Sequence, residues 1–222
     1  HEVSVLCRSA SGAAYEANIN GVHVYRLPPG TYPLPRGRYL YHLRAVARRL
    51  FNQSLVKCSW AREVRRHIRD LESREGAFDV IEYPECGGEG ALLGGVSGAA
   101  GVVRLHTPWS HIRAYDLLHE RAPDRLLLGL MERHSARRAD AVTSPSAALA
   151  RLMEHQWRLR NVTVFPNPIN SHEYARARGT NWMYVGRVER RKGVHVLIEA
   201  YARLCRRGSP PRLLLLGRPY GA

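Results

Sequence analysis

Four cations and two glycines lie together in one short segment near the end of the sequence. The segment GRVERRKG occupies residues 186–193. A fork-shaped guanidinium and a mobile ammonium beside a helix N-terminus are suited to binding a diphosphate. Arg187 and Lys192 would supply these charges, while Gly186 and Gly193 would let the backbone approach the ligand closely. The segment is therefore a candidate site for a phosphorylated ligand.

A solvated basic loop is the alternative, and the residues alone leave both interpretations open. Glu189 would then simply pair with Arg190 or Arg191. The flanking elements favour the anion site. The apolar strand WMYV (182–185) leads into the segment, and a helix with an apolar stripe begins at Gly193. In open parallel α/β sheets, ligands bind where the carboxyl ends of the strands meet.

Short apolar strands alternate with amphipathic helices along the rest of the chain. The expected strands lie at 2–7, 21–28, 78–85, 101–108, 140–146, 161–168, 181–187 and 211–217. The expected helices lie at 38–55, 59–73 and 124–138, with one more after each of residues 144 and 193. Strands that are apolar throughout, separated by helices, predict a parallel sheet in a doubly wound α/β fold.

Two of these helices carry specific local signals. In the second, one face at helical spacing should be buried, and it comprises Trp60, Val64, Ile68 and Leu71. In the fourth, Ser144 is the expected N-cap and Pro145 the expected first helical residue, where a missing N–H costs nothing. The polar stretch 171–180 is the best candidate for a linker. It would separate a first domain (1–170) from the start of a second (181–222).

The composition excludes several classes of protein. The formal charge is +15, but Lys57 and Lys192 are the only lysines and the arginines are spread along the whole chain. This argues against a dedicated nucleic-acid binder and leaves open attraction to an anionic membrane surface or to phosphorylated substrates. Four scattered cysteines suit a reducing, cytoplasmic setting and neither a disulfide framework nor a metal site. No apolar run is long enough to cross a membrane.

Several segments resemble one family of enzymes. YVGRVERRKGVHVLIEAYARL (184–204) is similar to the donor-site segment of glycosyltransferase family 4, whose members are retaining enzymes of GT-B fold. Other segments that resemble the family are HEVSVLC, FDVIEYPECGGEG, VVRLHTPW, ADAVTSPSAALA and VTVFPNPIN. The resemblance implies two Rossmann-like domains, of which the second is incomplete in this sequence. It also implies that the sequence lacks the family's first strand and loop and most of its C-terminal domain. Such a fragment would be inactive alone.

The resemblance assigns roles to particular residues. Arg187 and Lys192 would contact the diphosphate of a UDP- or GDP-linked sugar and stabilise the leaving group, with Gly186 and Gly193 shaping the turn. His106 would line the sugar pocket. Glu85 and Asn167 would belong to the same cleft. Members of the family usually have glycine at the position of Pro168, so this sequence departs from the family pattern there.

The expected activity is transfer of a hexose to the hydroxyl of a glycan or lipid-linked acceptor. No metal is expected, and the composition suggests bacterial cell-surface polysaccharide or glycolipid synthesis. Two other functions stay open: a non-catalytic GT-B-like partner subunit and a nucleotide-sugar epimerase of GT-B fold. At single positions, His106 could be an ordinary strand-end histidine and Glu85 an ordinary loop carboxylate.

Overall fold

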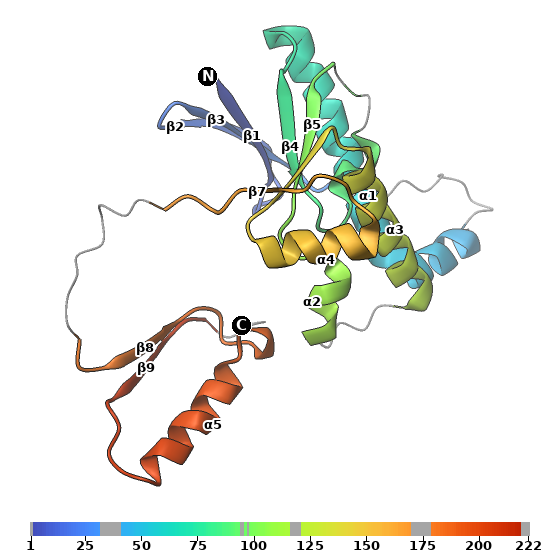
Figure 1. Ribbon diagram of the computed structural model, residues 1–222. Coiled ribbons are helices and arrows are strands. Elements are labelled where there is room, and N and C mark those ends of the chain that lie inside the picture. Colours follow the sequence, from blue (N-terminus) through green and yellow to red (C-terminus); the bar gives the residue numbers. More distant parts are fainter. Residues whose placement is uncertain are drawn as a thin grey trace. The chain divides into compact units, whose positions relative to one another are not determined.

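The computed structural model divides into two compact units that are described separately (Figure 1). It describes residues 2–31, 41–93, 96, 98–115, 121–169 and 179–218. The first unit comprises His1–Ser110 and His119–Pro166, and the second comprises His111–Leu118 and Asn167–Ala222. Most of the proposed linker, 171–178, lies outside the described residues.

A four-stranded parallel sheet forms the centre of the first unit. Its strands are β4 (Val80–Pro84), β5 (Ala100–Arg104), β6 (Ala141–Ser144) and β7 (Thr163–Val164), adjacent in this order. All three pairings are parallel, which confirms the expected sheet. Because every strand runs the same way, the segments that follow β4 and β5 emerge at the same edge.

A second, three-stranded sheet precedes it in the chain. Its order is β1 (Val3–Arg8), β3 (Val22–Leu27) and β2 (Tyr15–Ile19). Strand β2 was not predicted, although the Asn20-Gly21 pair that follows it is a strong hairpin signal. Both residues have positive φ, 53° and 85°, as a tight two-residue turn between antiparallel strands requires.

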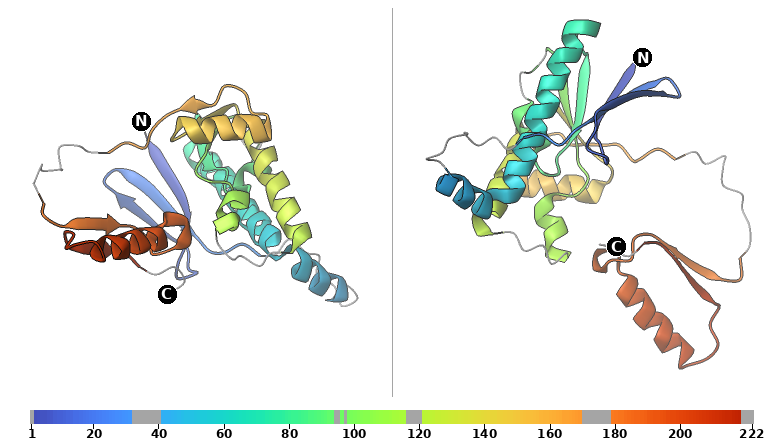
Figure 2. Two further views of the ribbon diagram at one scale, coloured as in Figure 1. Left: turned by 60° about the horizontal axis from the view of Figure 1, so that its bottom comes forward. Right: turned by 180° about the vertical axis from the view of Figure 1, so that it is seen from behind.

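Three helices accompany these sheets: α1 (Tyr41–Glu75), α3 (Ala122–Arg138) and α4 (Ala147–Trp157). The short helix α2 (Trp109–Tyr115) crosses the boundary between the two units in the chain. Figure 2 shows α1 running along both sheets. Its Trp60 and Leu71 pack with Tyr25 and Leu27 of β3, as the predicted apolar face requires. On the same face, one turn before Leu71, Ile68 joins the main core. There it packs with the parallel sheet and α4 around residues that are fully buried, including Val103, Leu105 and Met153.

The predicted boundary between the first two helices is wrong. The chain continues as one helical run through residues 56–58, and the irregularity lies earlier, at Phe51 (φ −131°, ψ 33°). Such a kink frees backbone N–H groups at the start of the second half of α1. Asp124 of α3 accepts two of them, from Gln53 and Ser54, at 2.8 Å each. The break is therefore set by a carboxylate distant in sequence, which local patterns cannot reveal.

Replacement of Asp124 should measurably destabilise the first unit. Asp124 is 3% exposed and caps the second half of α1, so Asp124→Ala leaves two N–H groups without their acceptor. We expect the free energy of unfolding in urea to fall by about 2 kcal/mol, the upper range for a lost cap. Asp124→Asn keeps an acceptor oxygen and should recover part of the loss. Equal stability of the alanine variant and the wild type would contradict the capping role.

The predicted cap of α4 is also wrong, by two residues. The side chain of Ser146 accepts the N–H of Leu149 at 3.2 Å and is the N-cap. Ser144 is the last residue of β6, and its hydroxyl donates to the carbonyl of Ser146 at 2.9 Å. Pro145 accordingly precedes the cap. The cap moves because Ser144 still belongs to β6, so the helix begins only after the chain has left the strand.

The second unit contains one strand–helix–strand repeat. Strand β8 (Trp182–Val185) pairs in parallel with β9 (Leu213–Leu216), and α5 (Val194–Cys205) connects them after the short helix η4 (Arg190–Lys192). In the described part of α5, Val194 is buried. Two other members of the predicted apolar stripe are exposed: Ile198 (47%) and Leu204 (41%).

Candidate functional site

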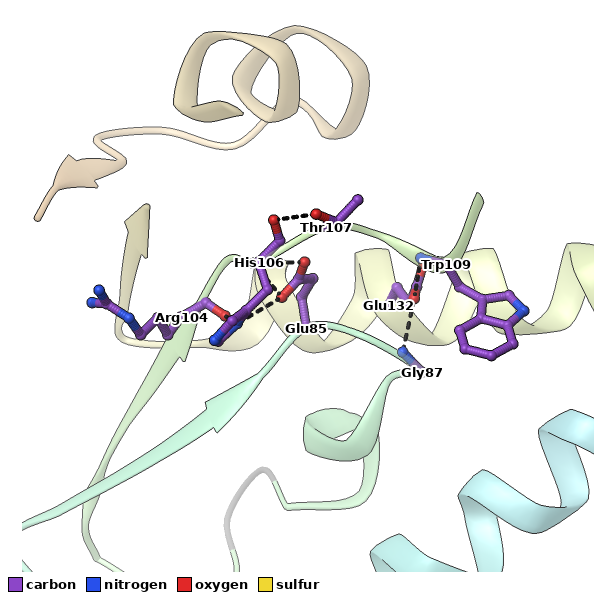
Figure 3. A network of polar contacts seen from close by, with 7 residues as sticks. All are labelled: Glu85, Gly87, Arg104, His106, Thr107, Trp109 and Glu132. Carbon is purple, nitrogen blue, oxygen red and sulfur yellow. Dashed lines mark hydrogen bonds and ion pairs between the residues drawn. The ribbon is translucent and has the colours of Figure 1, made fainter. Parts of the chain in front are cut away.

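The edge of the parallel sheet where β4 and β5 end holds two of the predicted site residues (Figure 3). Glu85 directly follows β4, and both of its carboxylate oxygens lie 2.8 Å from the backbone nitrogen of His106, which follows β5. The carboxylate is completely buried, whereas the imidazole is 56% exposed. Glu85 therefore fixes the backbone at His106 from inside the fold, while the His106 side chain faces solvent.

The ring of His106 is held in a defined orientation. Nδ1 lies 3.0 Å from the carbonyl oxygen of Arg104. A carbonyl can only accept, so this hydrogen bond places a proton on Nδ1. Nδ1 also lies 3.6 Å from the Glu85 carboxylate. Nε2 is consequently the ring nitrogen through which His106 can meet a ligand.

The surroundings of Glu85 have two opposing effects on the pKa of its carboxyl group. Burial raises the pKa of this carboxyl above its ordinary value. The His106 N–H bond and the nearby imidazole lower the pKa and offset part of that effect.

A second buried carboxylate, Glu132 of α3, was not identified from the sequence. It accepts the N–H groups of Gly87 and Trp109, each at 2.8 Å, and is completely buried (Figure 3). It thereby ties the turn after β4 to the segment after β5. One signal was available: Glu132 lies on the helical face that also carries Leu128 and Ser135, both buried.

Burial raises the pKa of Glu132 to about 7. The two backbone N–H bonds and the Lys57 ammonium lower this pKa, while the negative charge of Glu85 raises it further. A carboxyl with such a pKa changes its charge near neutrality. The connection between the two segments is therefore sensitive to pH in a range where an exposed glutamate would not be.

The turn between these carboxylates requires its glycine. Gly88 has a φ of 66°, in the left-handed region that favours glycine. A Cβ added there would lie 2.6 Å from the Cβ of Met131, the residue next to Glu132. Close packing of the turn against α3 is what allows the N–H of Gly87 to reach the Glu132 carboxylate.

The cationic segment of the second unit is organised by Glu189. This side chain is almost fully buried, and its Oε1 lies 2.9 Å from Nη2 of Arg191 and 3.3 Å from Nη2 of Arg187. Of the two partners considered from the sequence, Arg191 is the one found, and the pairing with Arg187 was not anticipated. Arg187 remains 52% exposed and Lys192 is exposed. Glu189 thus orients Arg187 without burying it.

The helix α5 starts directly after Gly193, as expected. Gly193 is its N-cap, in the left-handed conformation with a φ of 72°. The 3-10 helix Arg190–Lys192 leads into it, and the N–H of Gly193 donates to the carbonyl of Arg190 at 2.9 Å. Lys192 therefore precedes the N-terminus of α5, whose partial positive charge adds to its own.

Strand β9 holds the start of this segment in place. The N–H of Gly186 donates to Leu216 at 3.0 Å, and that of Val188 donates to Arg218 at 2.9 Å. A Cβ at Gly217 would lie 1.8 Å from the carbonyl oxygen of Gly186, so only glycine fits there. Gly217 was not identified as a site residue, because its neighbour becomes visible only when β8 and β9 pair.

The remaining features considered from the sequence are Asn167, a metal site, a membrane helix and the cysteines. Asn167 lies exposed beyond β7. In the described ranges, no group of three or more His, Cys, Asp and Glu side chains is placed to hold a metal ion. Over the same residues, no helix combines the length and apolar character needed to cross a bilayer. The four cysteines are free thiols.

Comparison with known proteins identifies the first unit. Residues 1–168 match the glycosyl transferase 4-like domain family, and this match spans the α/β unit with Glu85, His106 and Glu132. The segment 186–193 follows the matched region. A comparison with curated proteins found no match. The parallel sheet and its helices have the Rossmann-like arrangement of a GT-B glycosyltransferase domain. The chain therefore belongs to the glycosyl transferase 4-like family.

Proposed function

We propose that the protein transfers a sugar from a nucleoside-diphosphate sugar to an acceptor hydroxyl with retention of configuration. Family membership supports a glycosyltransferase in general terms. The observation that carries the finer proposal is the segment in which Arg187 and Lys192 precede the N-terminus of α5. Fixed cations next to a helix N-terminus match the charge of a diphosphate.

The same cations would favour the reaction and not only binding. Negative charge grows on the diphosphate as the bond to the sugar breaks, so positioned cations stabilise the transition state more than the ground state. The ion pair with Glu189 holds the Arg187 guanidinium in place before the donor arrives. Preorganisation of this kind avoids a cost at the moment of reaction.

His106 is the residue of the first unit that we assign to the sugar. Its backbone is fixed by Glu85 and its ring by Arg104, while the ring itself is exposed. We further propose that UDP or GDP is the leaving group and that no metal is needed. The cationic side chains would then supply the positive charge that neutralises the diphosphate. We assign the acceptor to the glycans or lipid-linked glycans of a bacterial cell surface. The free thiols support a reducing cytoplasm as the setting.

Lys192 provides the direct test of the donor site. Lys192→Ala should weaken binding of UDP or GDP by about 1.5–3 kcal/mol, the range for a hydrogen bond to a charged group. Titration calorimetry on the full protein measures this difference. Arg190→Ala is the matched control, since Arg190 is an exposed cation of the same turn. Unchanged affinity of the Lys192 variant for both nucleotides would remove the assignment.

His106→Ala should separate turnover from nucleotide affinity. Loss of a side chain that contacts the sugar is expected to lower kcat by about 100-fold, as for a general acid–base or polar group. The Kd for UDP or GDP should change by less than about two-fold, because His106 is not expected to contact the nucleotide. Loss of even one hydrogen bond to the nucleotide would change the Kd by more than that. Steady-state kinetics and nucleotide titration on the same preparation give both values. Wild-type turnover would mean that His106 is an ordinary strand-end histidine.

A further inference from the structure

The segment that carries His106 is held near both of its ends by buried carboxylates. The N–H of His106 donates to Glu85 and the N–H of Trp109 donates to Glu132, each at 2.8 Å. Between these two residues, the side chain of Pro108 is fully buried. The side chain of His106 itself is 56% exposed, so little packing surrounds it. The place and orientation of this imidazole therefore depend on how the backbone of the segment is held.

Glu132 holds the chain just beyond each partner of the Glu85–His106 hydrogen bond (Figure 3). It accepts the N–H of Gly87, two residues after Glu85, at 2.8 Å. It accepts the N–H of Trp109, three residues after His106, at the same distance. Both N–H groups donate to one atom, Oε1 of Glu132. A single buried oxygen therefore joins the two segments that bring Glu85 and His106 together.

The turn after β4 packs against α3 on either side of Glu132. A Cβ added at Gly88 would lie 2.6 Å from the Cβ of Met131, and one added at Gly90 would lie 2.3 Å from the hydroxyl oxygen of Ser135. Glu132, between these two residues of α3, is completely buried. Buried N–H groups that lose their acceptor are costly, so the two segments would have to move to satisfy them if Oε1 were removed.

We infer that Glu132 is a positioning residue for sugar transfer, because the two segments that it joins set the place from which His106 meets the sugar. This inference rests on the proposed function, in which His106 contacts the sugar. A displacement of about 1 Å at a reacting group can cost about 100-fold in rate. A buried side chain that only holds backbone, as Glu132 does, can thus control turnover without touching a substrate.

Replacements of Glu132 by side chains of similar length test the inference in the full protein. Glu132→Met removes the acceptor and should lower kcat by about 10- to 100-fold, while the KM for the donor should change by less than about three-fold. Glu132→Gln should stay within about three-fold of the wild-type kcat, because one amide oxygen can accept both N–H groups as Oε1 does. Glu132→Asp, a milder change, withdraws the carboxylate by one methylene and should lower kcat by an intermediate amount.

Asp124→Ala is the matched control for lost stability. Asp124 lies on the same helix and is also buried, but it caps α1 and does not contact the segment of His106 through any of its hydrogen bonds to Gln53 and Ser54. This variant should be destabilised and still keep the wild-type kcat. An equal loss of turnover in the Asp124 variant and in Glu132→Met would assign the loss to stability and overturn the inference.

The tautomer of His106 gives a readout that needs no substrate. Nitrogen NMR of labelled histidine, at about pH 8 where imidazoles are ordinarily neutral, should show a proton on Nδ1 in the wild type. The signal is identified by its absence from His106→Ala. Glu132→Met should give a mixture of both tautomers, and Glu132→Gln should keep the Nδ1–H form.

Wild-type turnover together with the wild-type tautomer in Glu132→Met would overturn the inference. If the methionine variant does not fold, the same result in Glu132→Asp would do so. Equal losses in the methionine and glutamine variants would also contradict it, because the glutamine keeps the acceptor oxygen. A wild-type protein that transfers no sugar would contradict the proposed function instead, and the tautomers would still decide whether Glu132 positions His106.

Discussion

Arg187→Ala should reduce the turnover number of sugar transfer by about 100- to 1,000-fold, or about 2.7–4 kcal/mol of transition-state stabilisation. The physical reason is that Arg187 is an exposed cation held by the buried carboxylate of Glu189, 3.3 Å away. It can meet charge that develops on a leaving diphosphate without first reorganising. The KM for the donor should change less than kcat, because the interaction strengthens as the bond breaks.

Kinetics of sugar transfer from the proposed nucleotide-sugar donor measure this effect, and two variants make it specific. Arg190→Ala removes an exposed cation of the same turn and should keep most of the activity. Glu189→Gln keeps the size of the side chain that orients Arg187 but removes its charge, so kcat should fall by an intermediate amount. If Arg187→Ala and Arg190→Ala lose activity equally, the segment acts as a diffuse positive loop and Arg187 has no separate role.

The second large effect is a pH dependence of stability that Glu132 creates. Its pKa is about 7 in the folded protein against an ordinary value of 4.5, so the folded state binds the proton more tightly. The stability that comes from this group is complete below about pH 4.5 and is lost as the pH rises through about 7. At about 1.4 kcal/mol per pH unit, the loss amounts to about 3 kcal/mol.

Comparison with Glu132→Gln isolates this contribution, because glutamine does not titrate. The free energy of unfolding of the wild type minus that of the variant should fall by about 3 kcal/mol between about pH 4 and about pH 8. Denaturant titrations at several pH values provide the curve. Glu82→Gln, at an exposed position of β4, should leave the wild-type pH dependence unchanged. A difference that stays constant with pH would show that Glu132 keeps one charge state throughout.

The elements and the class of the fold followed from short-range patterns in the sequence. Apolar runs such as FDVIEYPE and helical spacing such as Trp60, Ile68 and Leu71 are properties of neighbouring residues. The parallel sheet and the α/β class follow from their alternation. Even the hairpin at Asn20-Gly21 was readable locally, and its omission was a missed turn signal.

The partners of the buried carboxylates were decided only by tertiary structure. Asp124 meets α1 about 70 residues away, Glu132 meets Gly87 across 45 residues, and Glu85 meets His106 across 21. Gly217 is restricted to glycine only because β9 lies beside Gly186. A residue's type and spacing establish that it can accept a hydrogen bond or approach a backbone. Which N–H group it accepts from depends on packing that brings distant segments together, and burial then sets its charge.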